Sequence, residues 1–372
     1  MDVVVAGGGI FGATGALELK RRGHRVRLLD PGPLPHPLAA STDISKIVRL
    51  EYGADEPYTE MAERALAGWR RWNAELGEDL FHETGVLFLR QTPLSPGTFE
   101  GDSLEILKNR GHSLQRLSSA QIKSRYPAWN SDRYVDGIFN AQGGWVESAR
   151  AVTRLIREAE KAGVELCEGV IFKQGELPKC DAIVLALGAW TPFVLPQAAD
   201  WFRPHGMPVF HLRPADPKAF TADQFPVFGA DISTTGYYGF PIHQSGVVKI
   251  ANHGAGRVLD PSSSRAVSAA ETAGLRTFLK TTFPSLATAP IVQSHICVYC
   301  DTWDGHFWIA PDPERPSCVL ATGGSGHAFK FAPLLGGLIA DAVEGKVAPR
   351  FRWRPDSRPS KSDEAARSQS QA

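Results

Sequence analysis

The chain carries no excess of charge of either sign, because 40 lysines and arginines balance 40 aspartates and glutamates among its 372 residues. This composition gives no electrostatic reason to expect a nucleic acid or an anionic membrane surface as a partner. No apolar run reaches the roughly 18 residues that a membrane-spanning helix needs. What remains is the composition of a globular protein long enough for two domains or one large α/β domain.

Cysteine is also scarce: the five residues are Cys167, Cys180, Cys297, Cys300 and Cys318. An odd number of cysteines in a long chain argues against a disulfide framework, which is typical of small secreted domains. A strand-like run starts at the second residue, so we expect no signal peptide ahead of the fold. Both features predict a cytoplasmic location.

A strand, a glycine-rich turn and a helix make up the beginning of the chain. Residues 2–6 are a β-branched run typical of a buried parallel strand, and glycines follow with the spacing G-x-G-x-x-G. The first glycine permits a tight turn, the second lets a pyrophosphate approach the backbone, and the third lets the helix pack close to the strand. The helix N-terminus offers N–H groups and partial positive charge to phosphates. The contacts expected from this turn are Gly7, Gly9, Ile10, Phe11 and Gly12.

A second strand and an acidic residue support the same interpretation. The run 24–30 has a strand pattern and ends at Asp30, 18 residues after Gly12. In this type of fold a carboxylate about 20 residues beyond the glycines binds a nucleotide ribose. Together these features predict a dinucleotide site: a strand, a glycine turn, a helix, a second strand and a terminal acidic residue. A βα turn that binds no ligand is the alternative.

Helices and strands alternate again further along the chain and then give way mainly to strands. Amphipathic patterns predict helices near residues 58–76, 147–162, 264–282 and 333–343. Strand patterns occur near residues 81–90, 164–170, 182–187, 207–212, 236–242, 247–253, 291–299 and 318–321. The doubly wound pattern thus resumes after an interruption, whereas residues 200–300 are typical of a mostly antiparallel sheet in a second domain.

Three regions carry a resemblance to a known family. They are the N-terminal glycine motif, the segment Ser41–Arg49, and the segment Cys297–Phe307 with the glycine-rich stretch Gly323–Phe331. In this order and at these spacings they resemble the monomeric sarcosine oxidase family of FAD-dependent amine oxidases. That family also includes N-methyltryptophan, pipecolate, saccharopine and fructosyl-amino-acid oxidases.

The resemblance implies an α/β fold, with a Rossmann-like FAD-binding domain and an inserted α+β substrate domain built on an antiparallel sheet. We expect the FAD-binding domain at residues 1–80, 145–200 and 305–355. The substrate domain is expected at residues 81–144 and 201–304. Residues 356–372 are polar and rich in serine, so we expect a disordered tail there.

FAD, not NAD, is the cofactor that the resemblance implies, held by a covalent 8α-S-cysteinyl link at Cys297. Beyond the glycine motif, the implied cofactor contacts are Asp30, Ser41, Thr42, Lys46, Val170, Gly188, Trp190, Gly324, Gly326, His327 and Lys330. Cys300 forms a C-x-x-C with Cys297, a spacing also found in redox pairs and in half of a zinc site. No second pair or histidine cluster completes a zinc site, so no metal is expected. A buried inert thiol is the alternative for either cysteine.

The resemblance also implies which residues carry the reaction. Arg49 and Lys330 would hold the carboxylate of an amino-acid substrate, a task that suits fixed cations. Lys249, a lone charge in an apolar strand, would stabilise the superoxide that develops as oxygen is reduced. Tyr238 and His253 match an active-site tyrosine and histidine of the family. The alternatives are a structural ion pair for Arg49, a surface position for Lys330 and satisfied core positions for Tyr238 and His253.

The implied reaction is oxidation of the C–N bond of a secondary-amine amino acid to an imine, with O2 reduced to hydrogen peroxide by a monomeric enzyme. Lys46, Cys300 and Trp303 depart from the sarcosine type, so pipecolate, saccharopine or fructosyl-amino-acid oxidation stays open. A dehydrogenase, a flavoprotein without turnover and a plain NAD-binding module are remoter alternatives. The expected partners are an amine or amino acid and O2, with no nucleic acid, membrane or metal.

Overall fold

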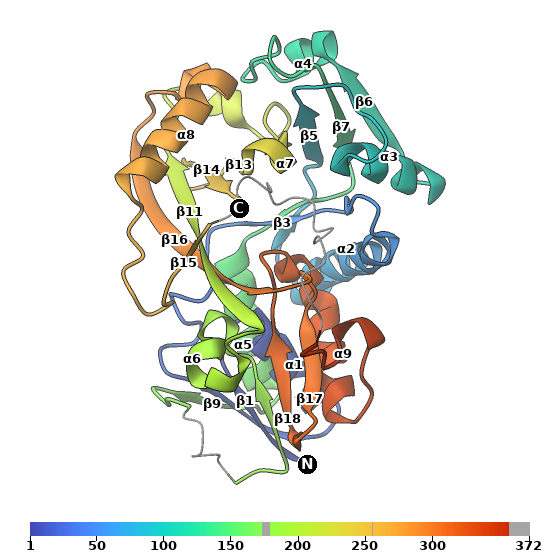
Figure 1. Cartoon of the computed structure of the whole chain (residues 1–372), viewed down its shortest axis with the longest axis vertical. Coiled ribbons are helices and arrows are strands. Elements are labelled where there is room, and N and C mark those ends of the chain that lie inside the picture. The colour runs from blue at the N-terminus through green and yellow to red at the C-terminus, as the bar shows by residue number, and fades with distance from the viewer. Residues whose placement is uncertain (173–178, 255, 357–372) are drawn as a thin grey trace.

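A six-stranded sheet forms one layer of the protein (Figure 1). The computed structural model describes residues 1–172, 179–254 and 256–356. Along the sheet the strands are β17 (Trp308–Asp312), β18 (Arg315–Thr322), β10 (Ala182–Leu185), β1 (Asp2–Ala6), β2 (Arg25–Asp30) and β9 (Glu165–Glu168). Neighbours from β18 to β9 are parallel, whereas β17 is antiparallel to β18. The three consecutive valines of β1 are fully buried, as expected for a strand covered on both faces.

Helices cover this sheet and bring distant parts of the chain together. The helix after the glycine turn, α1 (Ile10–Arg21), packs against α5 (Ser148–Lys161) and α9 (Ala332–Val343). The long helix α2 (Glu56–Leu76) packs against α9 in turn. One hydrophobic core therefore includes side chains from β1, α1, α2, α5 and α9.

A second, nine-stranded sheet lies in the upper half of Figure 1. Its path runs through β15 (Arg257–Val258), β11 (Phe202–Leu212), β14 (Val248–Asn252), β13 (Tyr237–Ile242), β12 (Val227–Ala230), β5 (Val86–Arg90), β7 (Asp136–Asn140) and β6 (Leu114–Ser118), and β16 (Ile291–Thr302) also pairs with β11. All pairs are antiparallel except β5 with β12. Helix α8 (Ala269–Thr282) packs its apolar side chains into the same core as Phe210 of β11 and Val248 of β14.

Small elements connect the two sheets. A three-stranded sheet has the order β3 (Lys46–Val48), β8 (Gly144–Val146) and β4 (Phe81–His82). The remaining helices are α3 (Phe99–Asn109), α4 (Ser119–Arg125), α6 (Thr191–Val194) and α7 (Ile232–Thr235). Among the described residues, no helix is both long enough and apolar enough to cross a membrane.

The predicted α/β fold is confirmed, with differences at particular elements. The helix predicted to start near residue 264 starts at Ala269, because Ser268 and Glu271 form a capping box there. The strand region predicted over residues 81–90, with a turn at Thr84-Gly85, is two strands, β4 and β5, and these belong to different sheets. Helix α3 and strand β12 were not predicted. The expected tail falls on residues 357–372, which lie outside the described residues.

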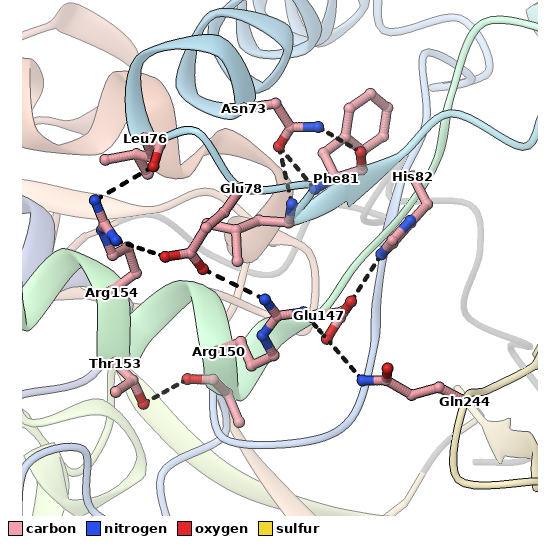
Figure 2. Close-up of polar contacts among 12 residues, drawn as sticks. Asn73, Leu76, Glu78, Phe81, His82, Glu147, Arg150, Thr153, Arg154 and Gln244 are labelled. Carbon is pink, nitrogen blue, oxygen red and sulfur yellow. Dashed lines mark hydrogen bonds and ion pairs between the residues drawn. The ribbon is translucent and has the colours of Figure 1, made fainter.

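Charged and amide side chains link the two parts of the fold at the N-terminus of α5, as Figure 2 shows. The Glu147 carboxylate accepts hydrogen bonds from Arg150 Nη1 (2.7 Å) and Gln244 Nε2 (3.4 Å) and lies 2.9 Å from His82 Nε2. Burial alone would raise the pKa of Glu147, but the hydrogen bonds from Arg150 and His82 outweigh it and lower that pKa. Because Gln244 belongs to the turn between β13 and β14, this network holds the second sheet against α5.

Candidate active site

The turn between β1 and α1 has the geometry that a dinucleotide requires. Gly7 has φ +103°, and a Cβ on Gly12 would stand 1.7 Å from the carbonyl oxygen of Gly7. A side chain at position 12 would therefore force α1 away from β1. Gly9 is the N-cap of α1, so no cap side chain occupies the first N–H groups of the helix. Asp30 ends β2 beside this turn and accepts a hydrogen bond from the backbone N–H of Gly8 (2.8 Å).

A cavity of about 480 Å³ lies at the carboxyl ends of β1, β2, β10 and β18, where ligands bind in open α/β sheets. Its volume falls within the range of about 300–1,000 Å³ typical of ligand and cofactor sites. We call it the nucleotide cavity. Of the residues predicted to bind cofactor, its lining contains Gly7, Gly9, Ile10, Phe11, Asp30, Ser41, Lys46, Val170, Gly188, Trp190, Gly324 and Gly326.

The other predicted cofactor residues lie elsewhere. The Thr42 hydroxyl donates to backbone carbonyls of its own loop, the nearest being that of Ala39 at 2.8 Å. Gly12 does not line the cavity but lets α1 pack close to the turn, as described above. Thr42 and Cys297 are also not in the described lining of the nucleotide cavity. His327 and Lys330 line a second, smaller cavity, which we call the substrate cavity. The roles of these residues stay predictions.

One face of the second sheet carries the predicted reactive side chains. Lys249 on β14 lies opposite His211 on β11. The β11 residues two and four positions before His211 pair with His295 and Cys297 of β16, respectively. Because side chains alternate along a strand, these four side chains share one face, while Phe210 points to the α8 side. Figure 1 shows β14, β11 and β16 side by side.

Lys249 is 1% exposed, and its charge is compensated by an aspartate. The Nζ atom lies 2.7 Å from Asp43 Oδ2 and donates a hydrogen bond of 2.5 Å to the carbonyl of Ser45. Burial lowers the pKa of Lys249 to about 8, and Asp43 opposes this effect, whereas the like charge of Lys46 adds to it. Lys249 can therefore carry a positive charge at neutral pH in a dry position.

Cys297 lies beside a cation, whereas Cys300 does not share its surroundings. Lys46 Nζ is 3.8 Å from Cys297 Sγ. Burial opposes the charge of Lys46, but Cys297 and Asp43 raise its pKa to about 12. Cys300 is three residues further along the same strand, so it faces the other side and packs in a different core. Burial raises the pKa of Cys300 to about 11, consistent with an inert thiol.

The geometry of β16 also excludes a redox role for the C-x-x-C pair in this conformation. Three strand residues separate the two Cα atoms by about 10 Å, and a disulfide needs roughly 7 Å or less. All five cysteines are free. Among the described residues, moreover, no group of three or more histidines, cysteines or carboxylates is placed to hold a metal ion.

The substrate cavity has a volume of about 50 Å³ and adjoins the nucleotide cavity. Lys46, Tyr299, Gly326 and Phe329 line both cavities, which therefore meet at these residues. The remaining described lining of the substrate cavity is Ile47, Arg49, Phe88, Phe228, Ile232, Tyr238, His253, His327 and Lys330. It contains three cations and no carboxylate, so it favours an anionic group.

Of these three cations, Arg49 most directly indicates an anionic ligand. Its guanidinium is 5% exposed and lies over the rings of Tyr52 (4.6 Å) and Phe99 (5.2 Å). No described residue accepts a hydrogen bond from its Nη1 atom. A buried, unsatisfied donor is costly, and a ligand carboxylate in the cavity would satisfy it.

Lys330 is held in the wall of the same cavity. Its Nζ donates to Tyr52 Oη (2.9 Å) and to the carbonyl of His327 (2.8 Å). Trp69 of α2 donates in turn to the Lys330 carbonyl (2.7 Å), so the long helix fixes the backbone at this point. The ammonium is thus placed by three separate segments before any ligand binds.

Tyr238 and His253 stand together in the lining of the substrate cavity, with ring centroids 6.4 Å apart. Tyr238 Oη lies 3.4 Å from Tyr299 Oη, and burial raises the pKa of Tyr238, so its hydroxyl is neutral at ordinary pH. The His253 ring lies 5.7 Å from the Tyr299 ring. The five residues predicted to be catalytic therefore lie around one region: four line the substrate cavity, and Lys249 lies on the adjoining sheet face.

Several residues of this region were not singled out from the sequence. Asp43 and Tyr299 stand inside the motifs that carried the resemblance, but nothing in a linear pattern shows their partners. Phe88 on β5 and Phe228 on β12 also line the cavity, and these two strands pair in parallel. Their side chains lie on opposite faces of the sheet, because Phe88 is opposite Gly229 and packs in a different core from Phe228. Only a prediction of the strand pairing could have placed both residues at the cavity.

Comparison with known proteins gives the class. The chain belongs to the FAD dependent oxidoreductase family, whose model matches residues 2–342. It is therefore an FAD-dependent oxidoreductase, and the family resemblance predicted from the motifs is confirmed. The nucleotide cavity fits this cofactor, because its glycine turn leaves room that a Cβ would fill and its walls come from the predicted binding residues.

The individual relatives have low sequence identity to this chain. The chain is 27% identical over 365 residues to monomeric sarcosine oxidase from Arthrobacter sp. (strain TE1826), with 93% of each chain covered. It is 28% identical over 378 residues to N-methyl-L-tryptophan oxidase from Salmonella arizonae, covering 95% of this chain and 97% of that one. Among solved structures it resembles fructosamine oxidase (Amadoriase II) from Aspergillus fumigatus, with a TM-score of 0.81, 25% identity, and coverage of 95% and 90%.

Proposed function

We propose that this enzyme oxidises the C–N bond of a secondary-amine amino acid to an imine and passes the electrons to O2. The amine loses two electrons and two protons, and O2 gains both to become hydrogen peroxide. One observation supports this most. A cavity lined by Arg49 and Lys330 meets the nucleotide cavity beside the sheet face that carries Lys249 and Cys297.

The protein's part in this reaction is to bind, orient and stabilise charge, while FAD supplies the electron-accepting chemistry. Arg49 and Lys330 would bind the carboxylate and so direct the amine toward the junction of the two cavities. Phe88, Phe228 and Ile232 would exclude water from the bound amino acid. Lys249 would stabilise the negative charge that appears on oxygen, because a fixed cation in a dry site needs no reorganisation.

The cofactor contacts are proposed at the glycine turn, Asp30 and the described walls of the nucleotide cavity, with a covalent bond to Cys297. The geometry around Cys297 supports this bond. Reactive cysteines are partly marked by electropositive surroundings. Lys46 Nζ lies 3.8 Å from Cys297 Sγ.

The walls of the substrate cavity favour a compact, apolar amino acid. Apart from its cationic and hydroxyl groups, the wall contains Ile47, Phe88 and Ile232, which offer no hydrogen bonds to a sugar hydroxyl, and an unsatisfied polar group against them is costly. The volume of about 50 Å³ holds only a few water-sized groups. Among the open alternatives, we therefore propose an N-methyl or cyclic amino acid ahead of a fructosyl or saccharopine substrate.

A peroxide-release screen tests this function. N-methyl amino acids, proline, pipecolate, saccharopine and fructosyl amino acids would each be supplied to the purified yellow protein in air. We expect peroxide from the compact substrates and bleaching of the flavin when they are added without oxygen. Bleaching without peroxide in air would instead indicate a dehydrogenase, and no bleaching by any amine would contradict the proposal.

Replacing Lys330 with methionine tests the carboxylate site. Losing one hydrogen bond to a charged group should cost about 1.5–3 kcal/mol, which is roughly ten- to a hundredfold in kcat/KM. The loss should appear with the amino acid and be much smaller with the corresponding decarboxylated amine. Steady-state rates with both substrates would check this, with the exposed Lys346→Met as a matched control. Equal slowing of both substrates would contradict the assigned role.

Location and assembly complete the proposal. Five free cysteines are consistent with a reducing compartment, which supports a cytoplasmic enzyme. One relative is named as a monomeric oxidase, and we propose a monomer here as well. Size-exclusion chromatography with light scattering would test the monomer directly.

A further inference from the structure

Asp43 lies directly behind Lys249, and the proposed reaction does not yet give it a role. Asp43 is 7% exposed, and its Oδ2 atom lies 2.7 Å from Lys249 Nζ. The pair joins two distant parts of the chain, because Asp43 precedes β3 and Lys249 is on β14. A buried carboxylate is expensive unless a partner compensates it, and so is a buried ammonium.

Three further groups face the Asp43 carboxylate. His211 Nε2 of β11 lies 3.6 Å from Oδ1, and His295 Nε2 of β16 lies 4.0 Å from Oδ2. The positive charge of Lys46 on β3 also acts on this carboxylate. Burial alone would raise the pKa of Asp43, but Lys249, His211 and Lys46 hold it well below its ordinary value. Asp43 is therefore an anion throughout the physiological pH range.

The position of Asp43 does not depend on its charge. Its backbone carbonyl accepts hydrogen bonds from Ser148 Oγ (2.6 Å) and from the Ala149 N–H (2.9 Å) at the start of α5. These contacts come from α5, which the network of Figure 2 holds in place. A side-chain substitution of similar shape would leave them intact, so an effect of removing the carboxylate can be separated from loss of the loop.

We propose that Asp43 is a positioning residue for oxygen reduction: it holds the Lys249 ammonium in one place and keeps it charged at neutral pH. This inference rests on the proposed oxidase function, in which the charge of Lys249 is needed. Without Asp43, burial and the neighbouring Lys46 would both favour the neutral amine. The aspartate therefore determines the pH range in which oxygen can react quickly.

The kinetic test uses holoenzyme reduced with dithionite, so no amine substrate is needed. Reoxidation by O2 would be followed by stopped flow between pH 5.5 and 9.5. In the wild type the charge of Lys249 is present below its pKa of about 8 and lost as the pH rises through that value, so reoxidation should slow there. In Asp43→Asn the same decline should begin about one to three pH units lower. Reoxidation at pH 7.5 should then be about threefold to two-hundredfold slower than in wild type.

Two further variants separate this role from a structural one. Asp43→Glu keeps the charge and should retain a decline near the wild-type pH. Asp136→Asn is the matched control, because Asp136 is as buried as Asp43 but pairs with Arg116 of β6, several strands away from Lys249. It should therefore reproduce the wild-type profile. Flavin content and the thermal unfolding midpoint would be recorded for each variant.

A second readout does not use activity. NMR of holoenzyme labelled with 13C-lysine would follow the Lys249 signal, assigned from its loss in Lys249→Met, during a pH titration. The Lys249 midpoint should fall in Asp43→Asn and stay in place in Asp136→Asn. An unchanged midpoint and an unchanged reoxidation profile in Asp43→Asn would overturn the inference. If reduced wild-type enzyme does not react with O2 at all, the oxidase function itself fails.

Discussion

Lys249→Met should reoxidise at least about a hundredfold more slowly than the wild type, while reduction by the amine slows much less. An ammonium within about 4 Å of a developing negative charge contributes on the order of 4 kcal/mol at an effective dielectric of ~20. A hundredfold loss corresponds to about 2.7 kcal/mol. Lys249 is almost fully buried, so water cannot replace the missing charge.

Stopped-flow spectroscopy separates the two half-reactions of Lys249→Met. The reductive half is measured without oxygen by mixing enzyme with the amine, and the oxidative half by mixing reduced enzyme with O2. Lys249→Arg is a useful second variant, because its larger guanidinium must fit beside Asp43 and need not restore the rate. Wild-type reoxidation in Lys249→Met would show that Lys249 is structural and would remove the main residue-level support for an oxidase.

Cys297→Ser should abolish the covalent attachment of FAD, an all-or-none change. Acid-precipitated wild-type protein should stay yellow, whereas the variant should release its flavin into the supernatant. The reason is that a serine hydroxyl is a much weaker nucleophile than a thiolate at neutral pH. Cys297 also has the neighbouring cation Lys46, at 3.8 Å.

Cys300→Ser provides the matched control for this experiment. The two cysteines stand on the same strand but face opposite sides of it, so only Cys297 shares the face of Lys249. The Cys300 variant should keep a yellow pellet. A colourless wild-type pellet would exclude the bond, and release of flavin only from Cys300→Ser would move the bond to Cys300.

Local sequence patterns were sufficient for the cofactor class and for much of the first sheet. The valines of β1, the three glycines and Asp30 are adjacent or nearly so in the chain, and their spacing directly reflects the strand–turn–helix geometry. Helix α9 was predicted to within one residue for the same reason, because its apolar pattern and Pro333 are local signals. The family followed from motifs of this kind.

The partners of the buried charges required the tertiary structure. Asp43 and Lys249 are far apart in the chain, and their contact depends on how the segment before β3 lies against β14. The C-x-x-C spacing was open to a redox or metal role because the pattern does not state the backbone conformation. Once that segment is a strand, alternation sends the two thiols to opposite faces.

The wall of the substrate cavity also could not be predicted from local sequence patterns. Phe88 was an unremarkable apolar residue in the sequence, and the place of β5 in the second sheet brings its ring to 5.9 Å from the Arg49 guanidinium. Periodicity and turn residues encode which segments become strands and helices, because these depend on neighbours in the chain. Strand order and register depend on the packing of the whole molecule, and they determine which side chains meet in the cavity.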